Sequence, residues 1–140
     1  MYIMNRNKII ILLMSFFMLT PSLVIAADCL FCNIVNRSEP AKVIAENNDV
    51  MVFESLRPRY PSHWLIIPKK HIQDTKSTKP EDQKVLGSLL LAAGTLGKQL
   101  DGAQAYNLQI NEGSQAGQTV FHLHLHFYSQ NKLIAKDPKI

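Results

Sequence analysis

The feature that most constrains the fold is residues 121–128, Phe-His-Leu-His-Leu-His-Phe-Tyr. Strict alternation of histidine with apolar residues predicts a β-strand, because successive side chains of a strand point to opposite faces. The predicted strand therefore has one core face and one chemically active face. The imidazoles belong to His122, His124 and His126, and the predicted core side chains are Phe121, Leu123, Leu125 and Phe127.

A loop of small and polar residues, 111–119, leads directly into this strand. Its backbone N–H groups could bind the anionic oxygens of a phosphoryl group without a metal. Neutral imidazole is a competent nucleophile near neutral pH. Loop and strand together favour a catalytic role for His124, as a nucleophile or a base. The alternatives are an ordinary connecting loop and a solvated strand face that carries histidine by chance.

The chain has 140 residues, which fits one domain preceded by a targeting segment. Residues 1–26 have a basic start, an apolar run and small residues before a cleavage point after Ala26, so we predict an export signal. The protein is then exported, to the periplasm of a Gram-negative bacterium, and meets a membrane only during export. The alternative is an anchor formed by residues 9–25. The domain itself is residues 27–140.

Charge argues against one class of partner. Excluding the signal removes Arg6 and Lys8 and no acidic residue, so the formal charge falls from +4 to +2. The remaining sequence has no basic stripe with interleaved aromatic residues. We therefore expect no nucleic acid polymer as a partner.

Hydrophobic periodicity predicts an α+β domain built on a mostly antiparallel, five-stranded sheet with one long and one short helix. The short helical turn is predicted to begin at Asp28, and the long helix to follow a capping box at 78–81. Gly94 and Gly97 lie inside the long helix and indicate either a close backbone approach, such as one to a second subunit, or simple tolerance. The predicted strands are 42–46, 50–54, 63–68, 105–110 and 121–128.

The chain resembles the histidine triad (HIT) superfamily, whose signature is His-x-His-x-His-x-x with apolar x, and is most similar to the Hint branch of purine nucleotide phosphoramidases. The matching motifs occur in the family's order at 29–32, 61–71, 111–113 and 117–128. The resemblance implies a HIT-like fold and a homodimer whose sheets join. It also implies hydrolysis or nucleotidyl transfer at the α-phosphorus of nucleoside phosphoramidates or related nucleotides, through a covalent nucleotidyl-histidine.

The resemblance also assigns roles to individual residues. His124 would be the nucleophile, His122 and His126 would frame it, and His63 would support it. Ser55 stands where the family usually has an acidic residue that holds the ribose hydroxyls, so nucleoside binding is expected to differ here. The residues implied to contact the phosphate and its leaving group are Asn111, Gly117, Gln118 and Thr119.

Cys29 and Cys32 form a Cys-x-x-Cys motif, which by itself fits a disulfide, a redox pair or a metal site. Some bacterial HIT proteins and the related galactose-1-phosphate uridylyltransferases hold a structural zinc with such a pair and two histidines. The resemblance therefore implies a structural zinc on Cys29, Cys32, His71 and His122, with no catalytic metal required. The alternative functions are a zinc-stabilised nucleotide-binding module without turnover and an exported thiol-redox protein.

Overall fold

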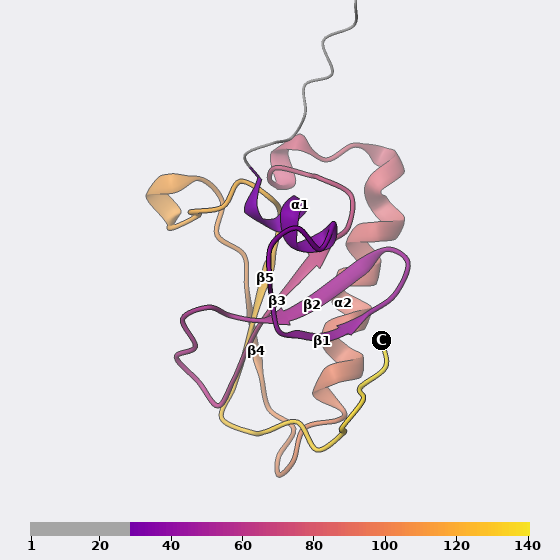
Figure 1. The fold of residues 1–140 in the computed structure, drawn as a ribbon, viewed down its shortest axis with the longest axis vertical. Coiled ribbons are helices and arrows are strands. Elements are labelled where there is room, and N and C mark those ends of the chain that lie inside the picture. Colours follow the sequence, from indigo (N-terminus) through magenta and orange to yellow (C-terminus); the bar gives the residue numbers. More distant parts are fainter. Residues whose placement is uncertain (1–28) are drawn as a thin grey trace, which may run out of the picture.

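The computed structural model describes residues 29–140, so the predicted signal at 1–26 lies outside the described residues. Five strands form one antiparallel sheet in the order β1-β2-β3-β5-β4 (Figure 1). This arrangement confirms the predicted α+β class, with one short and one long helix. The elements are α1 (Leu30–Val35), β1 (Val43–Glu46), β2 (Val50–Glu54), β3 (Ser62–Pro68), α2 (Gln83–Gly97), β4 (Asn107–Gln109) and β5 (Leu125–Ser129), with short 3-10 turns at Thr75–Ser77, Pro80–Asp82 and Ser114–Ala116.

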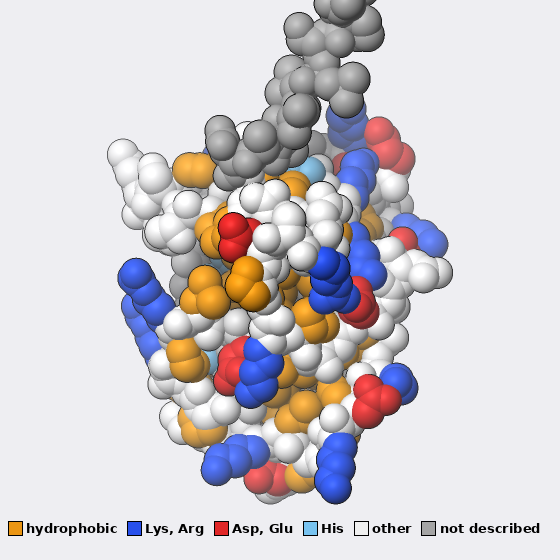
Figure 2. Space-filling model, viewed as in Figure 1, with side chains coloured by type: hydrophobic (Ala, Val, Ile, Leu, Met, Phe, Trp, Pro, Cys, Tyr) orange, Lys and Arg blue, Asp and Glu red, His pale blue; other side chains and the backbone are white. Residues whose placement is uncertain are grey.

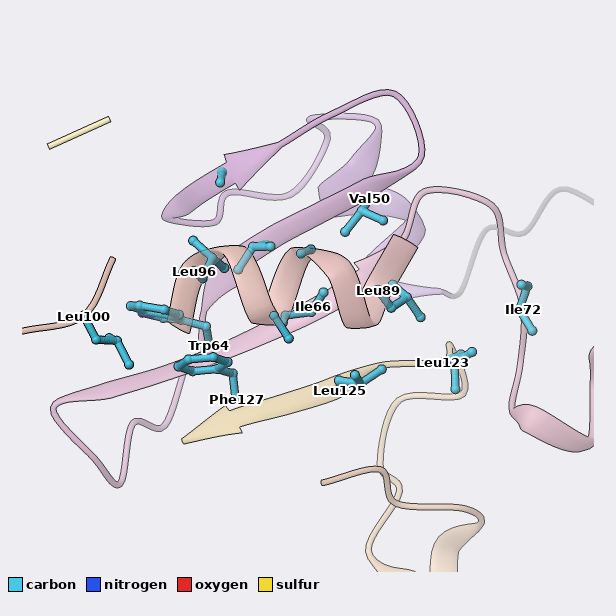
Figure 3. Packing of buried hydrophobic residues seen from close by; sticks show 14 residues of the cluster. Val50, Trp64, Ile66, Ile72, Leu89, Leu96, Leu100, Leu123, Leu125 and Phe127 are labelled. Atoms are coloured by element: carbon cyan, nitrogen blue, oxygen red, sulfur yellow. The ribbon is translucent and has the colours of Figure 1, made fainter. Parts of the chain in front are cut away.

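The strand register divides the sheet into two faces with different contents. Trp64 pairs with Phe127, and both point toward α2, which packs across this face (Figure 3). Leu65 pairs with His126 on the opposite face, where α1 packs against Leu65 through Phe31. The side chains of α2 therefore complete one core, and the histidine chemistry lies on the α1 side of the sheet. Among residues 29–140, no helix has the length and apolar character needed to cross a membrane.

The histidine strand is shorter than predicted. β5 begins at Leu125, because the preceding segment bonds to a loop instead of a strand: the N–H of Leu123 donates to the carbonyl of Ile72 at 2.6 Å. Leu123, Leu125 and Phe127 are buried as predicted, but Phe121 is 48% exposed and does not enter the core. The prediction that Phe121 is a core residue is therefore wrong.

The cap of α1 and the capping box before α2 each lie one residue later than predicted, and α2 itself begins at Gln83. Cys29 is the N-cap of α1, and its Sγ accepts the N–H of Cys32 at 3.3 Å, while Asp28 lies outside the described residues. Before α2, the carboxylate of Asp82 accepts the N–H of Lys79 at 2.9 Å. The cap that leads into α2 therefore uses Asp82 in place of the predicted Glu81.

The close approach inferred from the helix glycines occurs within the chain. A Cβ placed on Gly97 would meet the ring of Tyr106, which stacks on Phe127 with a centroid separation of 4.6 Å. A Cβ placed on Gly94 would meet no atom within 4 Å. Gly97 is needed so that Tyr106 can lie between α2 and Phe127, whereas Gly94 is simply tolerated.

We expect Gly97→Ala to lower the free energy of unfolding by about 1–3 kcal/mol, because the added methyl displaces the Tyr106 ring from its stack. Gly94→Ala is the matched control, and we expect it to raise stability by up to about 1 kcal/mol through helix propensity. Urea titration of both variants measures the difference. Equal effects of the two substitutions would contradict the assigned role of Gly97.

Candidate functional site

A cavity of about 590 Å³ opens on the α1 side of the sheet and gathers most of the predicted site residues. Its apolar wall comes from α1, β2 and β3, and its polar wall comes from histidines on β3 and near β5. The loop 111–119 closes a further side. The predicted residues that line it are Ser55, His63, Asn111, Gly117, Thr119, His124 and His126, and its apolar lining includes Leu30, Phe31, Phe53, Leu65 and Val120.

The tautomer of His124 is fixed by the backbone. Its Nδ1 lies 2.7 Å from the carbonyl oxygen of His122, and a carbonyl oxygen only accepts hydrogen bonds, so Nδ1 carries the proton. The lone pair is therefore on Nε2. Burial lowers the pKa of His124, which favours the neutral ring. A neutral, oriented imidazole in a cavity wall is a competent nucleophile.

A second hydrogen-bond chain fixes the tautomer of His126. The N–H of Arg59 donates to Nδ1 of His63 at 3.3 Å, so His63 carries its proton on Nε2 and donates it to Nδ1 of His126 at 3.2 Å. His126 must then carry its own proton on Nε2. Burial, helped by the neighbouring His124, lowers the pKa of His126 to about 4. His126 is thus a neutral hydrogen-bond donor beside His124.

His122 was predicted both to frame His124 and to belong to the metal-ligand set, and its imidazole lies with that set. Its ring is fully buried and is absent from the lining of the cavity. Its Nε2–H donates to the carbonyl of Pro68 at 2.8 Å, which leaves the lone pair of Nδ1 directed at Cys29 Sγ, 3.4 Å away. His122 therefore orients the His124 ring through its backbone carbonyl, while its imidazole belongs to the cysteine cluster.

The predicted metal ligands come together in the structure. One donor atom from each of Cys29, Cys32, His71 and His122 lies within 4.8 Å of all the others. Burial and the hydrogen bond to Cys29 raise the pKa of Cys32 to about 12, so a nearby cation is needed to make both thiols ionise. Two sulfur and two imidazole donors fit a soft or borderline divalent ion. This cluster could bind a metal.

Gln118 does not lie where the resemblance implied. Its side chain is buried, accepts the N–H of Gly113 at 2.8 Å and donates to the carbonyl of Gln73 at 2.9 Å. These bonds hold the base of the loop and point the amide away from the cavity, so Gln118 positions the loop and does not line the site. Gly117, at φ 87°, closes the 3-10 turn in a left-handed conformation that suits glycine.

Sequence reasoning missed several residues that line the cavity, among them Arg57, Arg59 and Tyr128. The first two lie in the Arg-Pro-Arg-Tyr-Pro segment, which the sequence marks only as irregular structure between β2 and β3. The available signal was their position directly after Ser55, whose Oγ accepts the N–H of Arg57 at 3.3 Å. Tyr128 could have been found from its alternation with His126.

The chain matches a family model and a curated protein. The family model "HIT domain" matches residues 36–133. A HIT-like protein of Synechocystis is 41% identical over 101 residues, which span 72% of this chain and 89% of that protein.

Two solved structures share the fold. A HIT family hydrolase from Legionella pneumophila superposes with a TM-score of 0.69 at 38% identity, over 73% of this chain and 92% of its own. A zinc-bound histidine triad family protein from Mycobacterium smegmatis superposes with a TM-score of 0.64 at 31% identity, over 80% of each chain.

Proposed function

The chain belongs to the HIT domain family, and we propose that it acts at the α-phosphorus of nucleoside phosphoramidates or related nucleotides, as a hydrolase or nucleotidyl transferase. The observation that carries this proposal is the 2.7 Å hydrogen bond from His124 Nδ1 to the His122 carbonyl, which leaves the Nε2 lone pair for attack. Family membership and the presence of a HIT family hydrolase among the similar structures support it.

The cavity offers a separate place for each part of a nucleotide. Phe31 and Phe53 form an apolar wall that suits a planar base. Asn111 and the backbone around Gly117 and Thr119 belong to the same lining as His124 and would face the phosphoryl group. Ser55, a neutral hydroxyl, replaces a carboxylate in this lining and can hydrogen-bond to the sugar.

The reaction takes two steps in this proposal. His124 Nε2 attacks phosphorus, an Nε2–P bond forms, and the bond to the leaving amine breaks as the amine takes a proton from solvent. His126 Nε2–H donates to a phosphoryl oxygen as its charge develops. Water then attacks the same phosphorus, breaks the Nε2–P bond, releases the nucleotide and returns a proton to solvent. No metal takes part in either step.

We expect His124→Ala to lower kcat for adenosine 5′-phosphoramidate by roughly a thousandfold or more, because the nucleophile is lost. Intact-protein mass spectrometry should trap an AMP adduct on the parent protein and none on the variant. Phe121→Ala is the control, since that half-exposed side chain lies outside the cavity lining. Undiminished turnover by His124→Ala would refute the mechanism, and AMP binding without turnover by the parent protein would support a binding module instead.

We also propose zinc as the ion for the cluster of Cys29, Cys32, His71 and His122. The donor set of two thiols and two imidazoles is one that structural zinc favours, and a zinc-bound relative supports the choice. When bound, the ion would tie the start of α1 to the loop after β3 and to the segment before β5. With four protein ligands, it would have no open position for substrate.

We expect one zinc per chain by elemental analysis, and its removal with a chelator should lower the melting temperature by at least about 10 °C. His71→Gln should lose the metal, whereas the matched control His63→Gln should keep it, because His63 lies outside the cluster. One zinc per chain in both purified variants would contradict the ligand assignment. A Cys29–Cys32 disulfide without metal would contradict the zinc proposal.

We further propose that two chains join along β4, the end strand of the sheet. Leu108 pairs with Phe127 and so points to the α2 face, as do Tyr106 and Ile110 by alternation. These three side chains are 36–43% exposed, and on α2 Leu90 and Leu91 are 60% and 73% exposed. An end strand with an apolar exposed row favours pairing with another strand.

Light scattering coupled to gel filtration should give twice the mass of one chain for the parent protein. We expect Leu108→Arg to shift the equilibrium to monomer, because a charge would be buried in the joined sheet. Ile134→Arg is the control at a side chain that is 68% exposed. A monomeric parent protein, or a dimer that Leu108→Arg leaves intact, would contradict this interface.

A further inference from the structure

Two arginines of the β2–β3 loop line the cavity and have no anionic partner there. Arg57 and Arg59 both line the cavity. Within residues 29–140, no Asp or Glu lines it. Within the same range, neither guanidinium forms an ion pair. Unpaired guanidinium groups in a concave wall favour an anionic ligand, and phosphate matches their donor geometry.

Backbone hydrogen bonds hold this loop at both arginines. The N–H of Arg57 donates to Ser55 Oγ, and the N–H of Arg59 donates to His63 Nδ1, each at 3.3 Å. Pro58 and Pro61 restrict the backbone on either side of Arg59. In Figure 2, Lys and Arg side chains project at the left edge, where the β2–β3 loop lies in Figure 1. The cations are thus presented on a restrained segment.

If a base packs on the apolar wall, as proposed, the chain direction puts Arg57 on the nucleoside side of the cavity. β2 supplies Phe53 to the apolar wall that suits a base, and the chain then passes through Ser55 to Arg57, all three in the lining. Arg59 adjoins the histidines, because its N–H donates to Nδ1 of His63 at 3.3 Å. A base on the apolar wall and phosphorus at His124 would set the ribose between them, beside Ser55 and Arg57.

The charge of the lining exceeds what one reacting phosphoryl group requires. Loop N–H groups and the His126 donor already face the reacting group. A neutral hydroxyl beside an arginine, with no carboxylate, is also the combination by which nucleotide sites accept a phosphorylated ribose, because a carboxylate there would repel the phosphate. An unphosphorylated ribose would leave the cation of Arg57 without a partner.

We propose that Arg57, assisted by Arg59, forms a subsite for a second phosphate on the ribose, so that the substrate is a nucleotide phosphorylated at the 2′ or 3′ position. This inference rests on the proposed function for the reacting phosphorus. The ester on the ribose takes no part in bond breaking and serves only for binding.

Calorimetry on the parent protein should compare AMP, adenosine 3′,5′-bisphosphate, adenosine 2′,5′-bisphosphate and ADP. We expect at least one bisphosphate to bind about tenfold or more tightly than AMP, with ADP gaining no such advantage. The advantage should shrink as salt concentration rises. The two isomers distinguish which ribose hydroxyl carries the phosphate.

Arg57→Gln should bring the ratio of bisphosphate to AMP affinity toward one. Lys84→Gln removes the same charge from α2, where the Lys84 side chain is 85% exposed and lies outside the cavity lining, and it should leave the ratio unchanged. AMP binding with no gain for either bisphosphate would overturn this inference and leave the proposed function standing. A gain for ADP equal to that of the bisphosphates would overturn the ribose assignment, and failure of every nucleotide to bind would overturn both proposals.

Discussion

The hydrogen bond from His124 Nδ1 to the carbonyl of His122 is the interaction on which the site depends. It orients the ring and decides which nitrogen holds the lone pair. The carbonyl is fixed in turn because the His122 ring is fully buried and bonded to the Pro68 carbonyl. His122 also faces the thiols of Cys29 and Cys32. One residue therefore connects the cluster of Cys29, Cys32 and His71 to His124, and any change that moves its backbone reorients the His124 ring.

The two faces of the sheet keep this chemistry apart from the main core. Leu125 and Phe127 pack under α2, while His126, between them, points to the α1 side. The apolar side of α2 packs on the face of the sheet opposite the candidate site. Its packing therefore does not constrain the positions of the site residues. The smaller α1 covers only part of the other face, and this leaves room for the cavity. The main core and the candidate site thus lie on opposite faces of the same three central strands, and a smaller core beside α1 borders the cavity.

Hydrophobic periodicity along the chain was enough to predict the sheet, and the alternation of histidine with apolar residues predicted the sidedness of His126 and the buried positions of Leu125 and Phe127. It could not show that β5 starts at Leu125, because the pairing of Leu123 with Ile72 depends on a loop distant in sequence. The predicted ligand set of the metal cluster came from resemblance, and the structure brings those residues together. The position of Gln118 outside the lining could not be predicted, because a motif identifies a residue type but not the direction of its side chain. The arginines were missed because a proline-rich loop has no periodicity to interpret.

Backbone groups, not carboxylates, set the protonation pattern of the histidines that line the cavity. The Arg59 N–H fixes His63, His63 fixes His126, and a carbonyl fixes His124. A carboxylate partner would orient an imidazole equally well, but its negative charge would oppose an anionic substrate at short range. Glu112, the acidic residue of the nearby loop, is not in the cavity lining. Its carboxylate accepts the N–H of Thr75 at 3.1 Å. Neutral groups orient the histidines, and arginines supply positive charge to the cavity wall. Both features suit an anionic ligand.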